Sequence, residues 1–564
     1  MSETRQERID RIAANGAFDV IVVGGGINGI GVFHDLAQQG VRVLLVEMND
    51  FCSGCSAAPS RMIHGGLRYL ENGEISLVRE SLNERDRLLR NAPHFVRPLP
   101  TTIPIDRLTS GMANAALGFL GFTGKPRPRG ALPIKLGLAL YDAIVGRKRM
   151  LPRHCFRGKA ATRAAWPALR SDVRCSATYH DAWISHPERL GIELIGDACA
   201  RNPEALALNY ARLSHPPEGL TLTLTDDEGD QCLAVSAKVI VNATGAWIDQ
   251  SAASLGARLS ERLVSGTKGS HLILDNPALR TALDGHMIYY EHSDGRVCIV
   301  FPYLGRVLAG STDLRVNEAG RTACSDEERD YILTALQALF PAIPVASDQI
   351  VYSYAGIRPL PFSEANFTGR MSRGHAVRRL QGDVPQIGMV GGKWTTYRAF
   401  AEEAVDLVLQ DLGRARQDTT QDLPIGGGAG YSDRLADDLV SQLGLTPARA
   451  AHLVDLYGSK AATVAAFCAA QDDQALPGGA LTEAEVVWYI QQEQALRLAD
   501  VLQRRSPLAI RGELSVDLIT ATARVMARTC GWSEARTKAE ITRFLSDLEI
   551  YHGVRLAQSE GISS

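Results

Sequence analysis

The segment from Asp19 to Glu47 constrains the fold of this chain more than any other. Its first apolar run, Val20 to Val23, is of the kind that is buried in a parallel strand, and glycines with the spacing G-x-G-x-x-G follow it at once. A second apolar run, Val41 to Val46, comes after a stretch of helix length, and Glu47 ends it. This order of strand, glycine turn, helix, strand and acid is typical of a Rossmann-type dinucleotide-binding unit.

The three glycines of this turn have separate roles. The first permits the tight turn, the second lets the backbone approach a pyrophosphate, and the third lets the helix pack closely on the strand. The pyrophosphate lies at the helix N-terminus, and the carboxylate of Glu47 accepts a ribose hydroxyl, which argues against a 2′-phosphate. We expect cofactor contacts from Gly24, Gly25, Gly26, Ile27, Asn28, Gly29 and Glu47.

Length and charge exclude several classes of protein. The chain has 564 residues, 45% hydrophobic and 22% charged, which is enough for two or three domains of ordinary composition. Its net charge of −3 gives no reason to expect nucleic acid as a partner. The N-terminal stretch lacks the apolar centre of a signal peptide, and no apolar run reaches the length of about 18 residues that a membrane span needs. We therefore expect a cytoplasmic location.

Two later segments repeat the pattern of a buried strand followed by a glycine turn and a helix. The run Lys238 to Val241 leads into the sequence NATGAW, and the run Ile387 to Val390 leads into GGKWTTY and a helix to about Leu412. Both turns place a helix N-terminus beside the first unit. We expect further cofactor contacts from Thr244, Gly245, Gly392, Lys393 and Thr395.

The stretches between and after these units have other patterns. Thr267 to Leu274 and Arg296 to Ala309 alternate in part, which predicts an antiparallel sheet with a substrate pocket against the nucleotide domain. Gln417 to Gly430 is polar and then glycine-rich, which indicates a linker.

The rest of the chain is predicted to be helical. Thr446 with Pro447 begins one helix that Gly458 ends, and Thr482 opens another that stops near Ser506. Ser515 and Ser533 cap two more. We find no catalytic group of residues here, so packing or a dimer contact is the expected role.

Several motifs in order resemble one family. They are GGGINGIG, then PSRMIHGGLRYLE from Pro59 to Glu71, NATGAW, KGSH, YAGIRPL and GGKWTTYR. From about Phe18 to Phe400 the chain resembles the FAD-dependent glycerol-3-phosphate dehydrogenases of the quinone-linked, aerobic type, and the helical tail resembles their C-terminal domain. The resemblance implies noncovalently bound FAD, electrons that leave for a membrane quinone, and a substrate pocket lined by Arg68, Tyr69 and Arg358.

The chain carries the residue types that this chemistry needs. Oxidation of a secondary alcohol beside a phosphate requires cations for the dianion, a base for the hydroxyl proton and a hydride acceptor such as flavin N5. Arg68, Arg358 and Arg373 are candidate phosphate anchors, with Tyr69 as a hydroxyl contact, and Arg370 competes with Arg373. Lys393 is expected to place positive charge near the flavin or the substrate.

Two histidines are candidates for the base. His64 in HGGLRY and His271 in KGSH each offer an imidazole that is neutral near physiological pH. We rank His64 first because the glycines beside it permit close approach to the isoalloxazine, and one histidine can polarise the substrate while the other deprotonates it. We also assign cofactor contacts to Ser53, Ser56, Arg61, His64, Gly65 and Gly356.

Two segments depart from the family pattern. Ser53 to Arg61 carries fewer hydroxyl groups than many relatives do. The C-x-x-C pair formed by Cys52 and Cys55 has no second pair at ligand spacing, so we expect neither a metal site nor a redox dithiol there. The segment 101–153 combines the apolar stretches GMANAALGFLGF and ALPIKLGLALYDAIV with basic flanks. An apolar face with such flanks suits the headgroup region of an anionic membrane, although a buried insertion or a dimer contact is the alternative.

These observations predict an α/β fold with a Rossmann-type FAD domain, an interleaved antiparallel substrate sheet and a C-terminal all-α domain. The FAD-dependent region spans about 18–425, with cofactor parts at 18–100, 230–265 and 350–412 and the sheet mainly at 165–230 and 265–350; the helical domain spans about 431–564.

The expected reaction takes sn-glycerol 3-phosphate to dihydroxyacetone phosphate, with a membrane quinone as acceptor and the enzyme peripheral on the cytoplasmic face of the inner membrane. Four alternatives stay open: a related substrate such as an erythritol phosphate, an oxidase that uses oxygen, a soluble NAD-dependent dehydrogenase, and a flavin-binding scaffold without enzymatic activity. A homodimer is also open.

Overall fold

The computed structural model describes residues 3–67, 74–107, 130–146, 149–225, 229–292, 294–363 and 374–556. In it the N-terminal unit forms the centre of a six-stranded sheet. The predicted strand, turn, helix and strand are β1 (Ala17–Val23), α2 (Ile27–Gln38) and β2 (Val43–Val46). The strand order is β18-β19-β11-β1-β2-β7, and only β18 and β19 are antiparallel neighbours. The remaining strands are β7 (Leu206–Leu208), β11 (Ser236–Asn242), β18 (His375–Leu380) and β19 (Gln386–Gly391).

Apolar side chains cover both faces of this sheet, as its buried strands require. Val20 and Val22 of β1 face the helices α2, α7 (Pro187–Arg201) and α11 (Tyr397–Asp411). Ile21 faces the other side, where α1 (Arg5–Ala14) packs together with a three-stranded sheet. That small sheet consists of β8 (Ala211–Ser214), β9 (Thr221–Leu224) and β10 (Gln231–Ala234).

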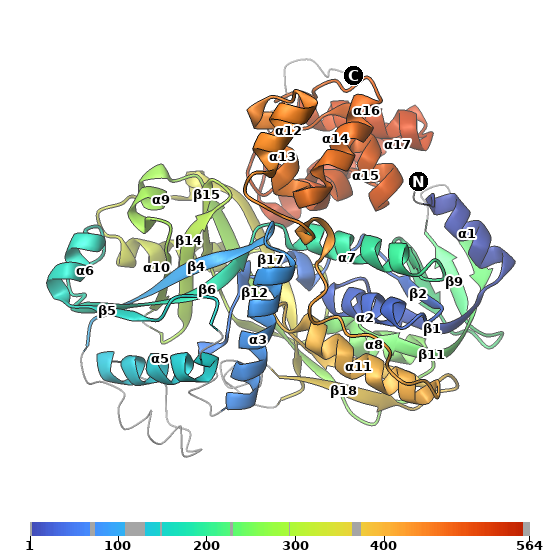
Figure 1. Ribbon diagram of the computed structural model, residues 1–564, viewed down its shortest axis with the longest axis horizontal. Helices are drawn as coiled ribbons and strands as arrows, with labels where there is room; N and C mark the ends of the chain where they lie inside the picture. Colours follow the sequence, from blue (N-terminus) through green and yellow to red (C-terminus); the bar gives the residue numbers. More distant parts are fainter. Residues whose placement is uncertain are drawn as a thin grey trace.

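A ten-stranded, mainly antiparallel sheet lies beside the nucleotide domain (Figure 1). Its longest pairing joins β12 (Val264–Leu274) to β17 (Ile350–Pro361), and β12 also pairs with β15 (Arg306–Gly310) and β16 (Leu314–Val316). Helices α9 (Pro277–Leu283) and α10 (Asp326–Leu339) pack on one face. The other strands are β3 (Met62–Ile63), β4 (Val96–Ile105), β5 (Cys155–Arg157), β6 (Cys175–Ile184), β13 (Met287–Glu291) and β14 (Val297–Tyr303).

Several strands lie in a different sheet from the one that the sequence predicted. Strands β4 and β17, expected in the cofactor part, belong to the ten-stranded sheet, where they pair along their lengths with β6 and β12. Strand β7, expected in the substrate sheet, extends the six-stranded sheet instead. Sheet membership depends on hydrogen-bonding partners far away in sequence, and no local pattern reveals them.

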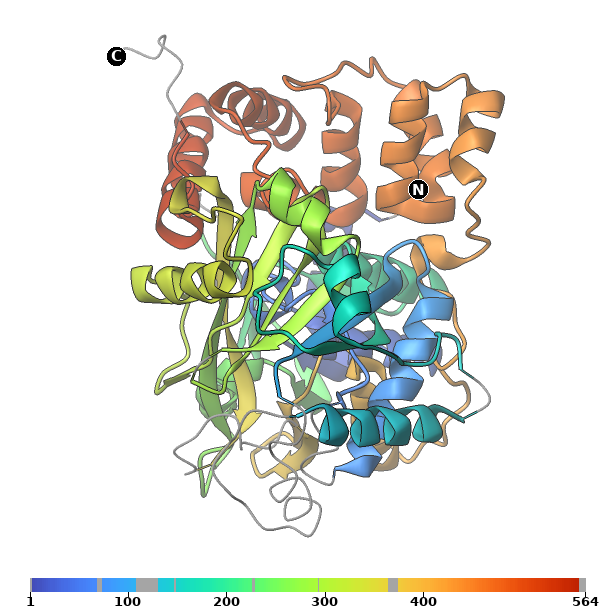
Figure 2. The same cartoon turned by 90° about the vertical axis from the view of Figure 1, so that its left-hand side faces the viewer.

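The C-terminal region is helical and stands above the two sheets (Figure 2). The side chains of the four residues expected at helix N-termini each accept the predicted backbone N–H: Thr446, Thr482, Ser515 and Ser533. The helices are α12 (Leu435–Leu443), α13 (Pro447–Tyr457), α14 (Ala461–Ala469), α15 (Glu483–Glu493), α16 (Val516–Cys530) and α17 (Glu534–His552).

One boundary in this region was predicted wrongly. Helix α15 ends at Glu493 and does not continue to Ser506, because Gln494 adopts a left-handed conformation. A short π-helix, Asp500–Arg505, follows. The side chain of Asp500 accepts the backbone N–H groups of Leu496 and Arg497 at 2.8 and 2.9 Å, which starts the new turn.

Helix α5 (Ala131–Val145) occupies the described part of the basic, apolar segment. Leu138 and Tyr141 are buried against helix α3 (Ile75–Asn91) and β6. The stretch GMANAALGFLGF lies outside the described residues. Within the part of the chain that the structure describes, no helix is both long enough and apolar enough to span a bilayer.

The glycine-rich stretch before the C-terminal helices is a packed joint. Gly426 and Gly427 are buried. A Cβ atom on Gly427 would overlap the carbonyl oxygen of Tyr457, and one on Gly428 would overlap that of Asn91. The sequence predicted a linker here, but the backbones of three segments approach so closely that only glycine fits.

We expect Gly427→Ala to destabilise this joint by about 1–3 kcal/mol, because the added methyl group forces the backbone of Tyr457 away. Equilibrium urea unfolding followed by tryptophan fluorescence measures the effect as a lower midpoint. Gly196→Ala is the matched control: Gly196 is exposed within α7 with nothing near its Cβ position, so alanine should stabilise by about 0.5–1 kcal/mol. Equal midpoints for the two variants would contradict the close packing.

Candidate active site

The glycine turn after β1 allows three pieces of backbone to meet. Gly24 has φ of +108°, and a Cβ atom there would lie 2.7 Å from the carbonyl oxygen of Ala243. A Cβ atom on Gly29 would overlap the carbonyl oxygen of Gly24. Gly26 is the N-cap residue of α2, so the first N–H groups of the helix face the turn. This backbone fits a pyrophosphate at the helix N-terminus.

The carboxylate of Glu47 lies at the end of β2, beside this turn. It accepts the backbone N–H of Gly25 at 2.7 Å and that of Asn49 at 2.8 Å. Burial raises the pKa of Glu47, and the two N–H donors oppose that rise in part. A carboxylate held at this strand end fits the ribose of a dinucleotide.

Three predicted cofactor segments converge on the start of α2. The hydroxyl of Ser56 accepts the backbone N–H of Ile27 at 2.9 Å. The indole N–H of Trp394 donates to the carbonyl of Ser56 at 3.1 Å. The amide of Asn28 donates to the carbonyl of Gly391 at 3.4 Å, and Gly392 lies against the same amide. The turn, the loop after β2 and the GGKW segment therefore surround one site.

Thr244 and Gly245 border this site from β11. The hydroxyl of Thr244 donates to Asn242 at 2.7 Å and lies 2.6 Å from the hydroxyl of Ser251. Gly245 has φ of +61°. Neighbouring protein groups thus already bind the Thr244 hydroxyl, which leaves main-chain atoms as the groups available to a cofactor.

The loop His64–Gly65–Gly66 is held by a carboxylate that the sequence did not single out. Asp181 of β6 accepts the backbone N–H of Gly65 at 2.9 Å and the hydroxyl of Tyr141 at 2.9 Å. Arg85 donates to the same oxygen at 3.1 Å. A Cβ atom on Gly65 would overlap the Tyr141 hydroxyl. His64 is partly buried and directly precedes this anchored backbone.

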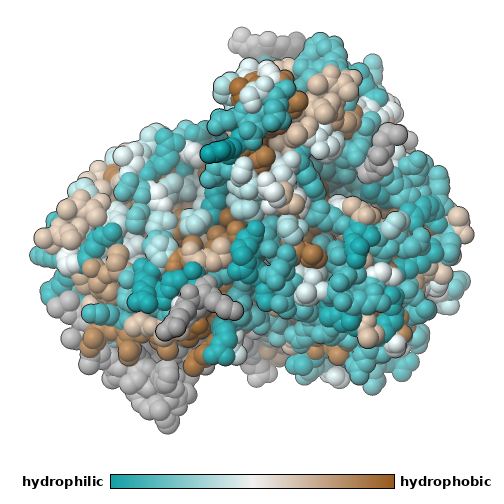
Figure 3. Space-filling model, viewed as in Figure 1, coloured by the Kyte–Doolittle hydropathy of each residue, from teal (hydrophilic) through white to brown (hydrophobic). Residues whose placement is uncertain are grey.

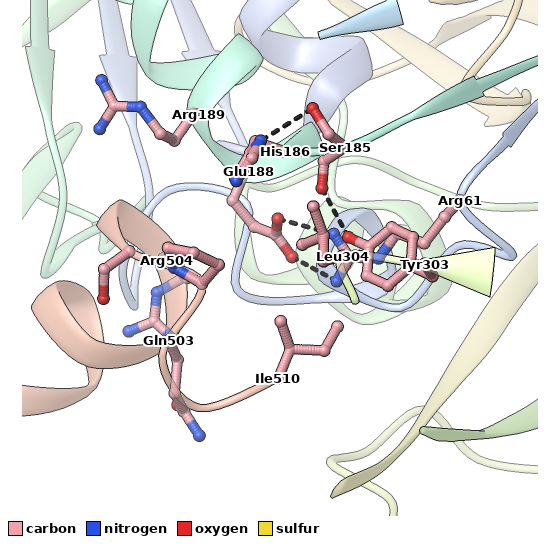
Figure 4. Close-up of a pocket in the computed structure, with 12 residues that line it drawn as sticks. Arg61, Ser185, His186, Glu188, Arg189, Tyr303, Leu304, Gln503, Arg504 and Ile510 are labelled. Carbon is pink, nitrogen blue, oxygen red and sulfur yellow. Dashed lines mark hydrogen bonds and ion pairs between the residues drawn. The ribbon is translucent and has the colours of Figure 1, made fainter. Parts of the chain in front are cut away.

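The guanidinium of Arg61 is engaged with the protein itself. It donates to both oxygens of Glu188 at 2.8 Å and lies over the rings of Tyr303 and Tyr354, at 5.8 and 5.6 Å from their centroids. Figure 4 shows this ion pair beside a small cavity that Arg504 also lines. A contact of Arg61 with the cofactor stays a prediction, and the ion pair makes Arg61 an anchor of the loop after β2.

Strands β12 and β17 place Arg358 over the sheet. Gly269 lies opposite Gly356, and the guanidinium of Arg358 occupies the position that a Cβ atom on Gly269 would need. Arg358 donates to Asp313 at 3.1 Å and to the hydroxyl of Ser311 at 3.4 Å. A guanidinium held flat beside hydroxyl and carboxylate groups fits the planar recognition of phosphate or carboxylate.

The His271 imidazole is enclosed between β15 and β17. It is 1% exposed and stacks on Tyr354 with the ring centroids 5.0 Å apart. Among the residues that the structure describes, neither ring nitrogen has a hydrogen-bond partner. Burial and then the charges of Arg358 and Arg61 lower the pKa of His271 to about 3. A buried imidazole with both nitrogens available fits a site that is completed by a polar ligand.

Lys393 lies between α3 and β18. Its charge helps lower the pKa of His375 to about 4, after burial as the main cause, and it opposes the rise that burial gives to the pKa of Glu80. His375 stacks on Phe400 with the centroids 4.3 Å apart. Thr395, another expected cofactor contact, is buried two residues further on.

The pair Cys52 and Cys55 consists of free thiols. Burial raises the pKa of both, so neither is activated as a thiolate. The Sγ atom of Cys52 packs against Gly191 of α7. Among the described residues, no group of three or more histidine, cysteine or acidic side chains is arranged to hold a metal ion.

Three predicted substrate contacts, Arg68, Tyr69 and Arg373, lie outside the described residues. The structure brings Asn28, Ser56 and the Gly391 segment together at the start of α2 and places His271 and Arg358 on neighbouring strands, whereas their roles in binding and catalysis stay predictions. Sequence reasoning missed Asp181 and Asp313. Asp313 follows the strand that carries Gly310, and its place between a glycine turn and an arginine was a weak signal. Asp181 lies within a strand, where nothing local distinguishes it.

Comparison with known proteins identifies the two parts of the chain. Residues 19–407 match the family described as FAD dependent oxidoreductase, and residues 418–537 match the C-terminal domain of alpha-glycerophosphate oxidase. A glycerol-3-phosphate dehydrogenase from Synechocystis sp. is 31% identical over 95% of this chain and 97% of its own. Glycerol-3-phosphate dehydrogenase 2 from Mycobacterium tuberculosis is 32% identical over 94% and 88%.

A solved structure shares the whole architecture. The glycerol-3-phosphate dehydrogenase from Bacillus halodurans, complexed with FAD, is 25% identical, with a TM-score of 0.75 and 99% of each chain covered. The predicted fold of FAD domain, interleaved sheet and C-terminal helices is therefore confirmed. The cofactor is FAD, and the NAD-dependent alternative is set aside. The chain belongs to the FAD-dependent glycerol-3-phosphate dehydrogenase family.

Proposed function

We propose that this protein oxidises sn-glycerol 3-phosphate to dihydroxyacetone phosphate and passes the electrons to a membrane quinone. The single observation that carries the substrate assignment is the pairing of a buried imidazole, His271, with a guanidinium, Arg358, on neighbouring strands beside the FAD domain. Relatives over nearly the whole chain are named for the same substrate. FAD, when bound, accepts hydride at N5 and returns it as electrons to the acceptor.

Arg358 is suited to hold the phosphate. Its contacts with Asp313 at 3.1 Å and Ser311 at 3.4 Å orient the guanidinium group. They do not enclose it, since 21% of the Arg358 side chain stays exposed. A phosphate dianion offers oxygens with the spacing of the guanidinium N–H groups. Arg68 and Tyr69 are proposed as further substrate contacts because the family motif places them in the pocket. Arg373, in competition with Arg370, is proposed as another phosphate anchor.

The base is proposed to be His271 or His64, and the surroundings of His271 favour a base that depends on substrate. Burial, and then the charges of two guanidinium groups, lower the pKa of His271 to about 3. A phosphate dianion bound to Arg358 would compensate one of these positive charges. The pKa of the imidazole would then rise toward the working pH, where a general base is most effective. The proton of the C2 hydroxyl then moves to an imidazole nitrogen as hydride leaves C2.

We expect Arg358→Ala to lower kcat/KM about 10²- to 10³-fold, mainly through KM, because a charged anchor of the phosphate is lost. Steady-state kinetics measure this, and the flavin absorbance should show FAD still bound. Arg379→Ala is the control, since Arg379 pairs with Asp411 on the surface and is 48% exposed. A near-normal kcat/KM would remove Arg358 from the site.

We expect His271→Asn to lower kcat by about 10²- to 10⁴-fold. Because the pKa of His271 is about 3, its neutral form persists as pH falls and is lost only near that value. Once corrected for the phosphate of the substrate, which titrates near about pH 6, kcat/KM should therefore show no acid limb from this residue above about pH 5. A larger loss of kcat in His64→Asn than in His271→Asn would instead make His64 the base.

Helix α5 supports delivery of electrons to a membrane. Its outer side presents Leu132 and Leu136, which are 55% and 72% exposed, with the exposed Lys135 between them. Figure 3 shows apolar surface at the position of α5. A helix with an apolar outer side and basic neighbours binds at the headgroup boundary. We propose that the enzyme docks there, peripherally, on the cytoplasmic side.

The test of this function is anaerobic flavin bleaching with a panel of polyol phosphates, followed by reoxidation. We expect glycerol 3-phosphate to bleach the 450-nm band, at roughly stoichiometric amounts, and quinone in anionic vesicles to restore it faster than oxygen does. Bleaching by an erythritol phosphate alone would change the substrate. Rapid restoration by oxygen would make the protein an oxidase, and no bleaching by any member would indicate a scaffold.

A further inference from the structure

The loop after β2 is tied to the C-terminal helices through one buried carboxylate. Asp50 is fully buried, and its first oxygen accepts Asn209 at 2.9 Å and Arg505 at 3.0 Å. Its second oxygen accepts Arg504 at 2.5 Å and a second N–H of Arg505. Two arginines from the far end of the chain therefore bind a single acid of the nucleotide domain.

The π-helix makes this double contact possible. Its i→i+5 winding, marked by the N–H of Ser506 donating to the carbonyl of Val501 at 3.0 Å, is wider than that of an α-helix, so consecutive side chains point in more similar directions. Arg504 and Arg505 thus reach the same carboxylate. Arg504 also donates to Asp500 at 2.6 Å, within its own turn.

The cluster balances its charges internally. It holds the acids Asp50 and Asp500 and the bases Arg504 and Arg505, and the hydroxyl of Tyr210 donates to Asp500 at 2.7 Å. Burial raises the pKa of Asp50, but the two guanidinium groups more than offset that rise and hold it below its ordinary value. Removing one arginine would leave a buried acid without full compensation.

Asp50 is only three residues from the carboxylate that faces the ribose position. Between them, the backbone N–H of Asn49 donates to Glu47 at 2.8 Å. Beyond Asp50, the N–H of Cys52 donates to the carbonyl of Gly25 at 2.9 Å, and Gly25 itself donates to Glu47 at 2.7 Å. The segment that carries Asp50 is therefore linked by hydrogen bonds both to the Glu47 carboxylate and to the glycine turn.

A second buried pair holds the other end of this loop. Arg61 binds Glu188 of α7, and Figure 4 shows Arg504 across a small cavity from that pair. The loop between Asp50 and Arg61 contains Ser56, which binds the first turn of α2. Of the two ends, the Asp50 end is the one whose charged partners, Arg504 and Arg505, belong to the C-terminal helical region.

We propose that Arg504 and Arg505 are positioning residues for the adenosine end of FAD: by binding Asp50 they hold Glu47 and the Gly25 turn in the geometry that binds the ribose and pyrophosphate. The C-terminal helical region thus retains the cofactor without touching it. This inference rests on the FAD site and does not depend on which substrate or acceptor the enzyme uses.

The test measures the rate at which FAD leaves the holoenzyme on dilution, followed by the fluorescence of released flavin. We expect Arg505→Met to release FAD about tenfold faster, because the Asp50 loop shifts. Arg505→Lys keeps the charge and loses the planar guanidinium. Its rate of FAD release should lie between that of Arg505→Met and that of the wild type. It also supplies the measurement if Arg505→Met does not fold.

A double-mutant cycle separates positioning from general stability. If Arg505 acts through Glu47, the release rate of the double variant Arg505→Met with Glu47→Gln should exceed that of Glu47→Gln alone by much less than tenfold. Arg449→Met is the matched control, since Arg449 forms a partly buried ion pair with Glu485 inside the C-terminal region, and it should leave release unchanged.

Three results would overturn the proposal: additive effects in the cycle, wild-type release from both Arg505 variants, or equal acceleration by Arg449→Met. Turnover per bound flavin distinguishes a failure of this positioning proposal from a failure of the proposed function. We expect Arg505 variants that retain FAD to bleach with glycerol 3-phosphate as the wild type does, whereas a wrong substrate assignment would abolish bleaching in the wild type too.

Discussion

A carboxylate buried in a protein is costly unless cations neutralise it, and this requirement fixes the loops around the cofactor site. Asp50, Glu188 and Asp181 are each almost fully buried, and each binds at least one arginine from another element. The loops joined in this way have little regular structure of their own. Their shape therefore depends on which arginine binds which acid. The backbone around the cofactor site takes the shape that these ion pairs impose.

The proposed substrate side of the site is built differently, because strands and not loops carry its side chains. Small residues let functional side chains lie against the sheet: Gly269 leaves room for the Arg358 guanidinium, and Gly310 leaves room for the His271 ring. Both side chains are carried by strands that pair along most of their length, which restricts their movement. A rigid sheet that presents a cation and an imidazole faces a cofactor site whose loops are held by ion pairs.

Local patterns predicted much of this arrangement. The spacing of Gly24 to Glu47 identified the nucleotide unit, because its glycines, strands and acid are adjacent in sequence. Helix caps such as Ser515 were predictable for the same reason. The placement of β4 and β17 and the role of Asp181 were not, since each depends on partners in distant segments. The sequence predicts a linker at glycines 426 to 428 because composition reflects polarity and not the closeness of other backbone segments.

The distance in sequence between Asp50 and Arg505, 455 residues, has a consequence for how the cofactor site forms. Contacts between distant segments carry a large loop-closure cost and tend to form late in folding. The nucleotide unit contains its own strands, helix and glycine turn, so it can assemble early as a local structure. Its loop after β2 still carries a buried acid that lacks its cations until the π-helix docks. Tight retention of FAD should therefore follow docking of the C-terminal helices, although the family model that matches this region, residues 418–537, lies wholly outside the FAD dependent oxidoreductase match at residues 19–407.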